Sequence, residues 1–212
     1  MGDRLFGFYF ITDPELSVHG MLEDVRGALE AGAVLVQYRN KGVGPFPHSP
    51  GLAVEMRRLC RESSVPFIVN DDVELARSIG ADGAHVGQGD LPASWVRREL
   101  GPRAIVGVSV STVEQVREAE QEGATYVAAS PVFATPTKPD AGPPIGIAGV
   151  KRLRAATRLP LAAIGGVRDD AIPLLVEAGA DLVCAISASL AGGTVEQNVR
   201  RLAGLMRRSV RG

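Results

Sequence analysis

One pattern recurs along this chain: a glycine ends a helical stretch, and an apolar strand begins within a few residues. Glycine tolerates the left-handed backbone turn that closes a helix, so each copy predicts a helix C-terminus that leads into a strand. The pattern occurs in EAGAVLVQYR at 30–39, SIGADGAHVG at 78–87, QEGATYVAASPV at 121–132 and EAGADLVCAIS at 177–187. A chain built in this way alternates helices with strands.

Four further apolar runs bring the predicted strands to eight. They are FGFYFITD at 6–13, VPFIVND at 65–71, RAIVGVS at 103–109 and LPLAAIGG at 159–166. Apolar residues at helical spacing lie between the strands, as in Val195, Val199, Leu202 and Met206.

The strands are continuous apolar runs, so both faces of the sheet should be covered by helices, as in a parallel sheet. Eight units that average about 26 residues predict a single (β/α)₈ barrel, a TIM barrel, as one catalytic domain over 1–212. The alternative is a doubly wound open sheet. It lacks its glycine fingerprint here, because ITDPELS follows the first strand.

Composition narrows the class of ligand. The formal net charge of −1 gives no long-range field for nucleic acid or an anionic membrane, so any bound anion must be held by a local cluster of donors. No apolar run reaches the ~18 residues of a membrane span, which predicts a cytoplasmic protein. Cys60 and Cys184 have no metal-ligand spacing and are interpreted as reduced packing residues.

Polar residues gather at the predicted C-terminal ends of the strands, where a barrel of this kind has its active site. In LVQYRNKG at 35–42, Gln37, Arg39 and Lys41 recur at every second position and so share one face of a strand. Strand interiors are expected to hold almost no polar groups. The strand-end set comprises Thr12, Asp13, Gln37, Arg39, Lys41, Asn70, Asp71, Gln88, Asp90, Ser109, Thr135, Thr137, Lys138, Gly165, Gly166, Ile186 and Ser187.

Asp71 and Asp90 end consecutive predicted strands, which a barrel would place roughly one strand spacing, about 5 Å, apart. Two close carboxylates repel each other unless a cation lies between them. Oxygen ligands without His or Cys favour a hard metal, so we expect Asp71 and Asp90 to hold Mg²⁺. The alternative is helix capping, by Asp71 or Asp72 before VELARSIG and by Asp90 before LPAS.

The loops after the seventh and eighth strands suggest a phosphate site. Gly165 and Gly166 close one strand and ISAS at 186–189 closes the next, and such loops often bind phosphate through backbone N–H groups. The alternative for the glycines is a tight turn before a helix capped by Asp169 or Asp170. The Pro- and Gly-rich loop at 133–144 is either a lid with phosphate donors or a plain surface loop.

In this arrangement Arg39 and Lys41 face the acidic pair across the barrel mouth. Cationic side chains and a divalent ion around one space describe a pyrophosphate clamp. No nucleophile with an adjacent base is evident, because His19 and His48 fall in helix or loop and His85 is interpreted as structural. The chemistry should therefore depend on positioning and charge stabilisation rather than on a covalent intermediate.

On these residues the chain resembles the thiamine-phosphate synthase family. The matching stretches run in family order and cover nearly the whole chain, and QxRxK, ND, HxGQxD and TxTK are together highly specific. The stretches are YFITD (9–13), VQYRNKG (36–42), FIVNDDVELA (67–76), ADGAHVGQGD (81–90), VGVSVST (106–112), SPVFATPTKPD (130–140), AIGGV (163–167) and ADLVCAISA (180–188).

The resemblance implies a barrel enzyme that joins hydroxymethylpyrimidine diphosphate to a thiazole phosphate, with Mg²⁺, after the pyrophosphate has departed. It assigns Asp71 and Asp90 to the metal and Ser109 to a place beside the reacting groups. It makes Arg39, Lys41, Ser109 and Lys138 the catalytic set. The remaining assignments are Gln37, Arg39, Lys41, Asn70 and Lys138 to the pyrimidine diphosphate, Thr135 and Thr137 to the thiazole, and Gly166, Ile186 and Ser187 to its phosphate.

Three other functions stay open at this point. A thiazole tautomerase of the sister branch typically has a His two residues after the Ser of a GxSxH-like segment, where this chain has Ser111. A phosphate-ligand sensor would keep the pocket without turnover, and a sugar-phosphate isomerase would need a placed acid–base pair. The expected partners are small-molecule substrates, without nucleic acid or membrane, and a homodimer is left open as the assembly.

Overall fold

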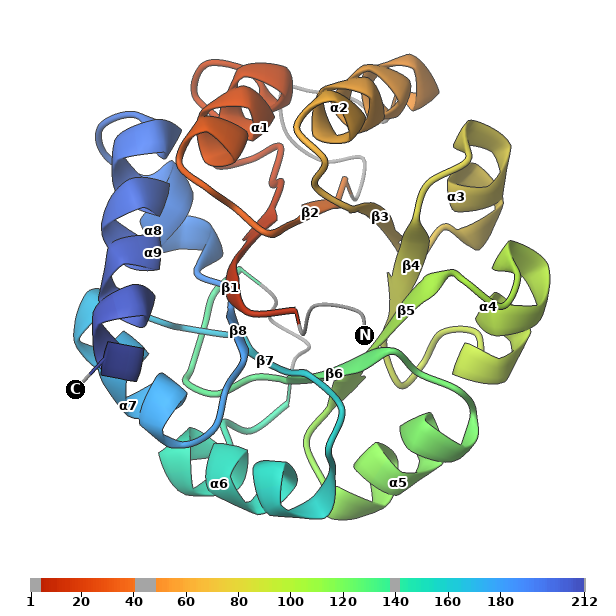
Figure 1. The fold of residues 1–212 in the computed structure, drawn as a ribbon, viewed down its shortest axis with the longest axis vertical. Coiled ribbons are helices and arrows are strands. Elements are labelled where there is room, and N and C mark those ends of the chain that lie inside the picture. The colour runs from red at the N-terminus through yellow and green to blue at the C-terminus, as the bar shows by residue number, and fades with distance from the viewer. Residues whose placement is uncertain (1–4, 41–48, 138–141, 212) are drawn as a thin grey trace.

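The computed structural model describes residues 5–40, 49–137 and 142–211. Within them, eight parallel strands pair in sequence order, and β8 pairs with β1 to close a barrel (Figure 1). This confirms the predicted (β/α)₈ fold. The strands are β1 (Gly7–Ile11), β2 (Leu35–Tyr38), β3 (Phe67–Asn70), β4 (Gly83–Val86), β5 (Ile105–Val110), β6 (Tyr126–Ala129), β7 (Leu161–Ala163) and β8 (Leu182–Val183).

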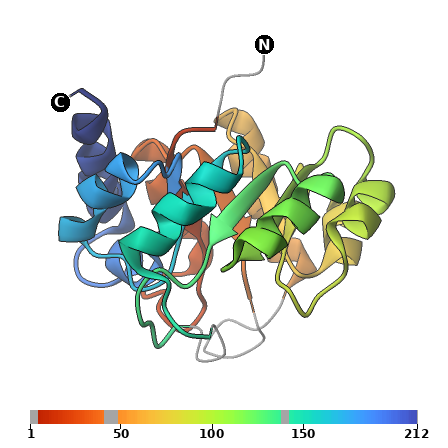
Figure 2. The same cartoon turned by 90° about the horizontal axis from the view of Figure 1, so that it is seen from below.

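Helices surround the barrel on its outside, as the side view in Figure 2 also shows. None of the helices in the described ranges combines the length and the apolar character that crossing a membrane requires. The helices are α1 (Met21–Glu30), α2 (Pro50–Glu62), α3 (Val73–Ile79), α4 (Ala93–Leu100), α5 (Val113–Gln121), α6 (Gly146–Ala156), α7 (Ile172–Glu177), α8 (Ile186–Leu190) and α9 (Val195–Arg211), with a 3₁₀ turn at Asp169–Ala171.

The recurring glycines end helices as predicted. Gly80 takes the left-handed conformation at the end of α3, and the glycines of the other three repeats, at 32, 123 and 179, also have positive φ. Helix starts use side-chain caps: the Asp72 carboxylate accepts a hydrogen bond from Leu75 N, and Thr112 with Gln115 forms a capping box on α5. Local sequence signals therefore set the helix ends of these four repeats and the starts of α3 and α5.

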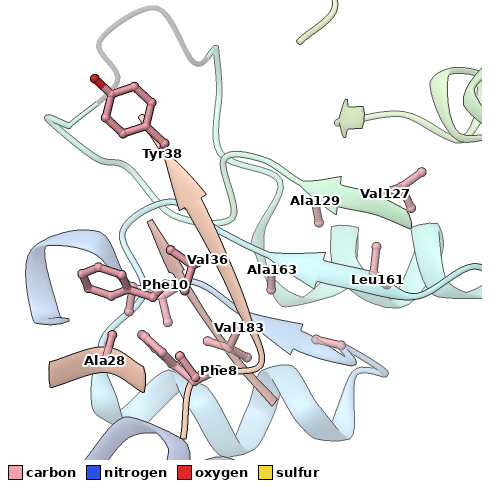
Figure 3. Packing of buried hydrophobic residues seen from close by; sticks show 14 of the residues in the cluster. Phe8, Phe10, Ala28, Val36, Tyr38, Val127, Ala129, Leu161, Ala163 and Val183 are labelled. Carbon is pink, nitrogen blue, oxygen red and sulfur yellow. The ribbon is translucent and has the colours of Figure 1, made fainter. Parts of the chain in front are cut away.

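Two apolar layers form the core, and alternate residues of each strand serve one or the other. Phe8, Phe10 and Val36 point outwards and pack against the helices, including Ala28 of α1 (Figure 3). The inner layer fills the barrel with Tyr9, Leu35, Ile68, Tyr126 and Leu182 among others. Each fully buried large apolar side chain contributes about 1.5–3 kcal/mol, so both layers stabilise the barrel.

The last strand of the barrel and the segment that follows it differ from the expectation. β8 comprises two residues, so Cys184 lies just beyond the strand, and Ile186 and Ser187 open the short helix α8 instead of a loop. Both cysteines are buried and reduced. Burial raises the pKa of the Cys60 thiol to about 12, which keeps it protonated and unreactive.

Candidate active site

A cavity of about 520 Å³ opens at the C-terminal ends of the strands. Eleven of the thirteen residues that the family resemblance assigns line it, from the ends of all strands but β1, and Gln88 and Gly165 of the strand-end set line it too. Lys41 and Lys138 lie outside the described residues. The eleven are Gln37, Arg39, Asn70, Asp71, Asp90, Ser109, Thr135, Thr137, Gly166, Ile186 and Ser187.

Arg39 is held in position by Thr12 and Asp13, the two residues that follow β1. Its Nη1 donates to Asp13 Oδ2 at 2.8 Å, and Asp13 is 3% exposed. Thr12 Oγ1 accepts from Arg39 N at 2.9 Å and donates to Arg39 O at 3.0 Å. Thr12 and Asp13 belong to the predicted strand-end set, but they fix the position of Arg39 instead of lining the cavity.

Gln37 and Ser109 are anchored by polar groups inside the barrel. Gln37 Nε2 donates to the Tyr9 hydroxyl at 2.6 Å, and Ser109 Oγ lies 2.9 Å from His85 Nε2. Gln88 Nε2 also donates to the Ser109 carbonyl at 2.7 Å. The expectation that strand interiors lack polar groups is therefore wrong. Tyr9 was missed because tyrosine in an apolar run looks like a packing residue.

The two carboxylates predicted to bind metal both reach the cavity. Asp72, not Asp71, caps α3. Asp71 directly follows β3 with φ 60°, and its backbone N–H donates to the His85 carbonyl at 2.8 Å. Asp90 Oδ2 accepts from Gly87 N at 2.7 Å, and α4 begins after Pro92 without a side-chain cap. Helix capping by Asp90 is therefore wrong.

These residues fit the donor set of Mg²⁺. Asp71 and Asp90 supply hard oxygen ligands at one cavity, and two carboxylates leave the remaining positions to water and substrate phosphate, as magnesium prefers. Within the described ranges, no group of three or more His, Cys, Asp or Glu side chains could hold a metal.

Gly165 and Gly166 form a tight turn with φ 100° and 60°. A Cβ on Gly166 would lie 2.4 Å from the Ala134 carbonyl oxygen, so the turn packs closely against the segment after β6. Phe133 N donates to the Gly165 carbonyl at 2.9 Å and fixes the start of the loop at 133–144. The glycines leave backbone exposed to the cavity with no side chain in the way.

The alternative interpretation, in which Asp169 or Asp170 caps the next helix, is wrong. Asp169 pairs with Arg201 of α9, and Asp170 pairs with Arg168 at 3.3 Å. No side-chain hydrogen bond caps the 3₁₀ turn or α7. The tight glycine turn forms, but without the cap that accompanied it in the prediction.

The family profile of thiamine monophosphate synthase matches residues 8–189. A thiamine-phosphate synthase of Moorella thermoacetica is 44% identical over 181 residues, 85% of this chain and 86% of the relative. One of Roseiflexus castenholzii is 44% identical over 195 residues, 92% of this chain and 85% of the relative.

A solved structure, the thiamine phosphate pyrophosphorylase from Pyrococcus furiosus, has 31% identity and a TM-score of 0.86, and the match covers 98% of both chains. Sequence and structure comparisons therefore agree over nearly the whole barrel. This chain belongs to the thiamine monophosphate synthase family.

Proposed function

We propose that this chain is a thiamine-phosphate synthase, a transferase that joins hydroxymethylpyrimidine diphosphate to thiazole phosphate and releases pyrophosphate. The main support for this function is that the ends of seven strands bring eleven predicted site residues to one cavity. A cavity of this size accommodates two small substrates side by side. The proposed second substrate is thiazole phosphate or its carboxylated form.

The diphosphate leaves first in the proposed mechanism, and a pyrimidine cation is then captured by the thiazole nitrogen. The departing pyrophosphate gains negative charge as its bond breaks, so a fixed cation binds the transition state more tightly than the ground state. Arg39, held by Asp13, supplies such a cation. Lys41 and Lys138 are proposed to add two more.

Asp71 and Asp90 would hold Mg²⁺, which when bound supplies further positive charge for the diphosphate. On the opposite side of the mouth, Gly166, Ile186 and Ser187 would bind the thiazole phosphate, and Thr135 and Thr137 the thiazole itself. Thr137 N donates to Thr135 Oγ1 at 3.3 Å, which keeps the two hydroxyl residues together. The cytoplasmic location and a homodimer stay predictions.

The test is to incubate the purified protein with both substrates and Mg²⁺ and to measure pyrophosphate and thiamine phosphate. Equal amounts of both products are expected. Binding of the substrates without either product would contradict the proposal and favour a ligand sensor.

Asp90→Asn tests the acidic pair, because the amide oxygen can still accept the hydrogen bond from Gly87 N while the charge is lost. We expect kcat to fall at least about a hundredfold with unchanged unfolding in urea. Asp72→Asn, at the neighbouring cap that does not line the cavity, is the matched control and should keep its activity. Normal turnover by Asp90→Asn would remove Asp90 from the metal site.

A further inference from the structure

A chain of hydrogen bonds crosses the barrel at the floor of the cavity, which Tyr9 and His85 help to line, and joins two residues of the proposed site. From Gln37 it passes to Tyr9, then to the Tyr126 hydroxyl at 2.9 Å, on to His85 Nδ1 at 2.8 Å, and ends at Ser109. Its members come from β2, β1, β6, β4 and β5. The three middle residues have no role in the proposed function.

Gly107 of β5 makes room for this chain of hydrogen bonds. His85, Gly107 and Tyr126 are register partners across β4, β5 and β6. Because Gly107 has no side chain, the Tyr126 ring lies over it and reaches His85 two strands away. Tyr9 and Tyr126 are 1% and 0% exposed, so their hydroxyls depend on each other and on the chain for hydrogen bonds.

With a neutral His85, the protons along the hydrogen-bond chain can run in one of two orders only. Within the described residues, the Tyr9 hydroxyl forms hydrogen bonds with Gln37 and Tyr126 alone. Burial raises the pKa of both tyrosines, so each keeps one proton and donates one hydrogen bond. If Gln37 donates to Tyr9, then Tyr9 donates to Tyr126 and Tyr126 donates to His85 Nδ1. His85 then carries its own proton on Nε2 and donates to Ser109.

The reverse order requires the Gln37 amide to be turned over, with its oxygen accepting from Tyr9. Every later donor then reverses, and Ser109 donates to His85 Nε2. A mixed order would either leave a buried tyrosine proton without an acceptor or set two hydroxyl oxygens against each other with no proton between them, and both are costly. The amide orientation of Gln37 and the role of the Ser109 hydroxyl are therefore coupled across the barrel.

We propose that Tyr9, Tyr126 and His85 are positioning residues that fix Gln37 as an acceptor and Ser109 as a donor towards the cavity. In the structure Gln37 Nε2 faces Tyr9, which leaves Oε1 for a ligand and frees the Ser109 proton. An N–H donor on the ligand would bind Gln37, and a nitrogen or oxygen acceptor would bind Ser109. This inference rests on the proposed function, and it assigns Gln37 and Ser109 to the aminopyrimidine substrate.

The first test measures the His85 tautomer in the enzyme without substrates, by ¹⁵N NMR of the histidine-labelled protein. The chain contains three histidines, so His85→Gln identifies the His85 signals. We expect neutral His85 with its proton on Nε2. A proton on Nδ1, or on both nitrogens, at pH 7 overturns the proposal whether or not the enzyme makes thiamine phosphate.

The second test is Tyr126→Phe, which removes the central hydroxyl. A tautomer mixture at His85 is expected, with KM for the pyrimidine diphosphate raised about three- to tenfold, the value of one neutral hydrogen bond. KM for thiazole phosphate should stay unchanged. Tyr38→Phe is the matched control, because Tyr38 is a buried tyrosine that packs outside the barrel.

Equal changes in both KM values, or a single His85 tautomer in Tyr126→Phe, would show that the hydroxyl only supports the fold. Should Tyr126→Phe fail to fold, Tyr9→Phe removes the neighbouring hydroxyl of the hydrogen-bond chain, and the same results are expected. If wild-type enzyme forms no product, the proposed function fails, while the tautomer result still decides the inference.

Discussion

At the scale of single residues, the position of Arg39 depends on Asp13. The guanidinium is 16% exposed and the Asp13 carboxylate 4%, so their ion pair is shielded from solvent. Asp13 Oδ1 also accepts from the backbone N–H groups of Glu15 and Leu16, which fixes the carboxylate itself. A charged group held in this way can meet the developing charge of a leaving diphosphate without reorganising.

Asp13→Asn should therefore impair catalysis without disrupting the loop. The Asn amide can still accept from Glu15 N and Leu16 N, but it no longer attracts Arg39. We expect kcat/KM for the pyrimidine diphosphate to fall about tenfold, because the guanidinium loses its fixed position. Steady-state kinetics measure this, with the exposed Glu15→Gln as the control. Wild-type kcat/KM in Asp13→Asn would show that Arg39 does not need its partner.

At the scale of strands, the packing of β6 against β5 depends on a glycine, Gly107, that has no side chain. A Cβ on Gly107 would lie 2.2 Å from Tyr126 Cζ and 2.3 Å from its hydroxyl oxygen. Gly107→Ala must displace a fully buried ring and should lower the free energy of unfolding by about 1–3 kcal/mol, as overpacking does.

Urea unfolding measures this loss. Gly51→Ala is the control, because Gly51 lies in α2 and a Cβ there would meet only Ser49 Oγ, at an ordinary contact distance of 3.8 Å. Alanine at this position should stabilise the helix by about 0.5–1 kcal/mol. If Gly107→Ala matched the wild type in stability, the close approach of Tyr126 to β5 would not exist in solution.

Sequence reasoning predicted the strands well but not which residues face inwards. The glycines at helix ends and the apolar runs identified all eight strands, because these signals are local. In a strand buried on both faces the residues show no polar–apolar contrast, so nothing in FGFYFI distinguishes Tyr9, inside the barrel, from Phe8 and Phe10 outside it. The hydrogen-bond chain from Tyr9 to His85 depends on strand register, which only barrel closure sets.

In the whole molecule, the cavity of the proposed active site and the arginine contacts that stabilise the fold lie at opposite ends of the barrel. The cavity is at the C-terminal strand ends, while half-buried arginines join loops at the N-terminal ends. Arg97 of α4 donates to the carbonyls of Ala104 and Gly123, before β5 and β6. Arg154 of α6 pairs with Asp181 at 2.9 Å and donates to Leu159 O at 3.0 Å, before β7 and β8. These helical arginines gave no sequence signal, since their partners are set by tertiary packing.

Arg154→Met tests this division between the two ends. Asp181 is 6% exposed and also accepts from Leu161 N, so removing Arg154 leaves a buried carboxylate without that cation. Losing one partner of a largely buried pair should cost about 2–4 kcal/mol of unfolding free energy. Because the pair lies far from the cavity end of the strands, kcat/KM per folded molecule should equal that of the wild type.

Urea unfolding and kinetics on the same sample measure both quantities. Arg152→Met, on an exposed position of α6, should change neither. A fall in kcat/KM with unchanged unfolding would mean that the N-terminal end also governs the active site. The opposite pattern, lost stability with full activity, is what a barrel with separate ends for folding and catalysis requires.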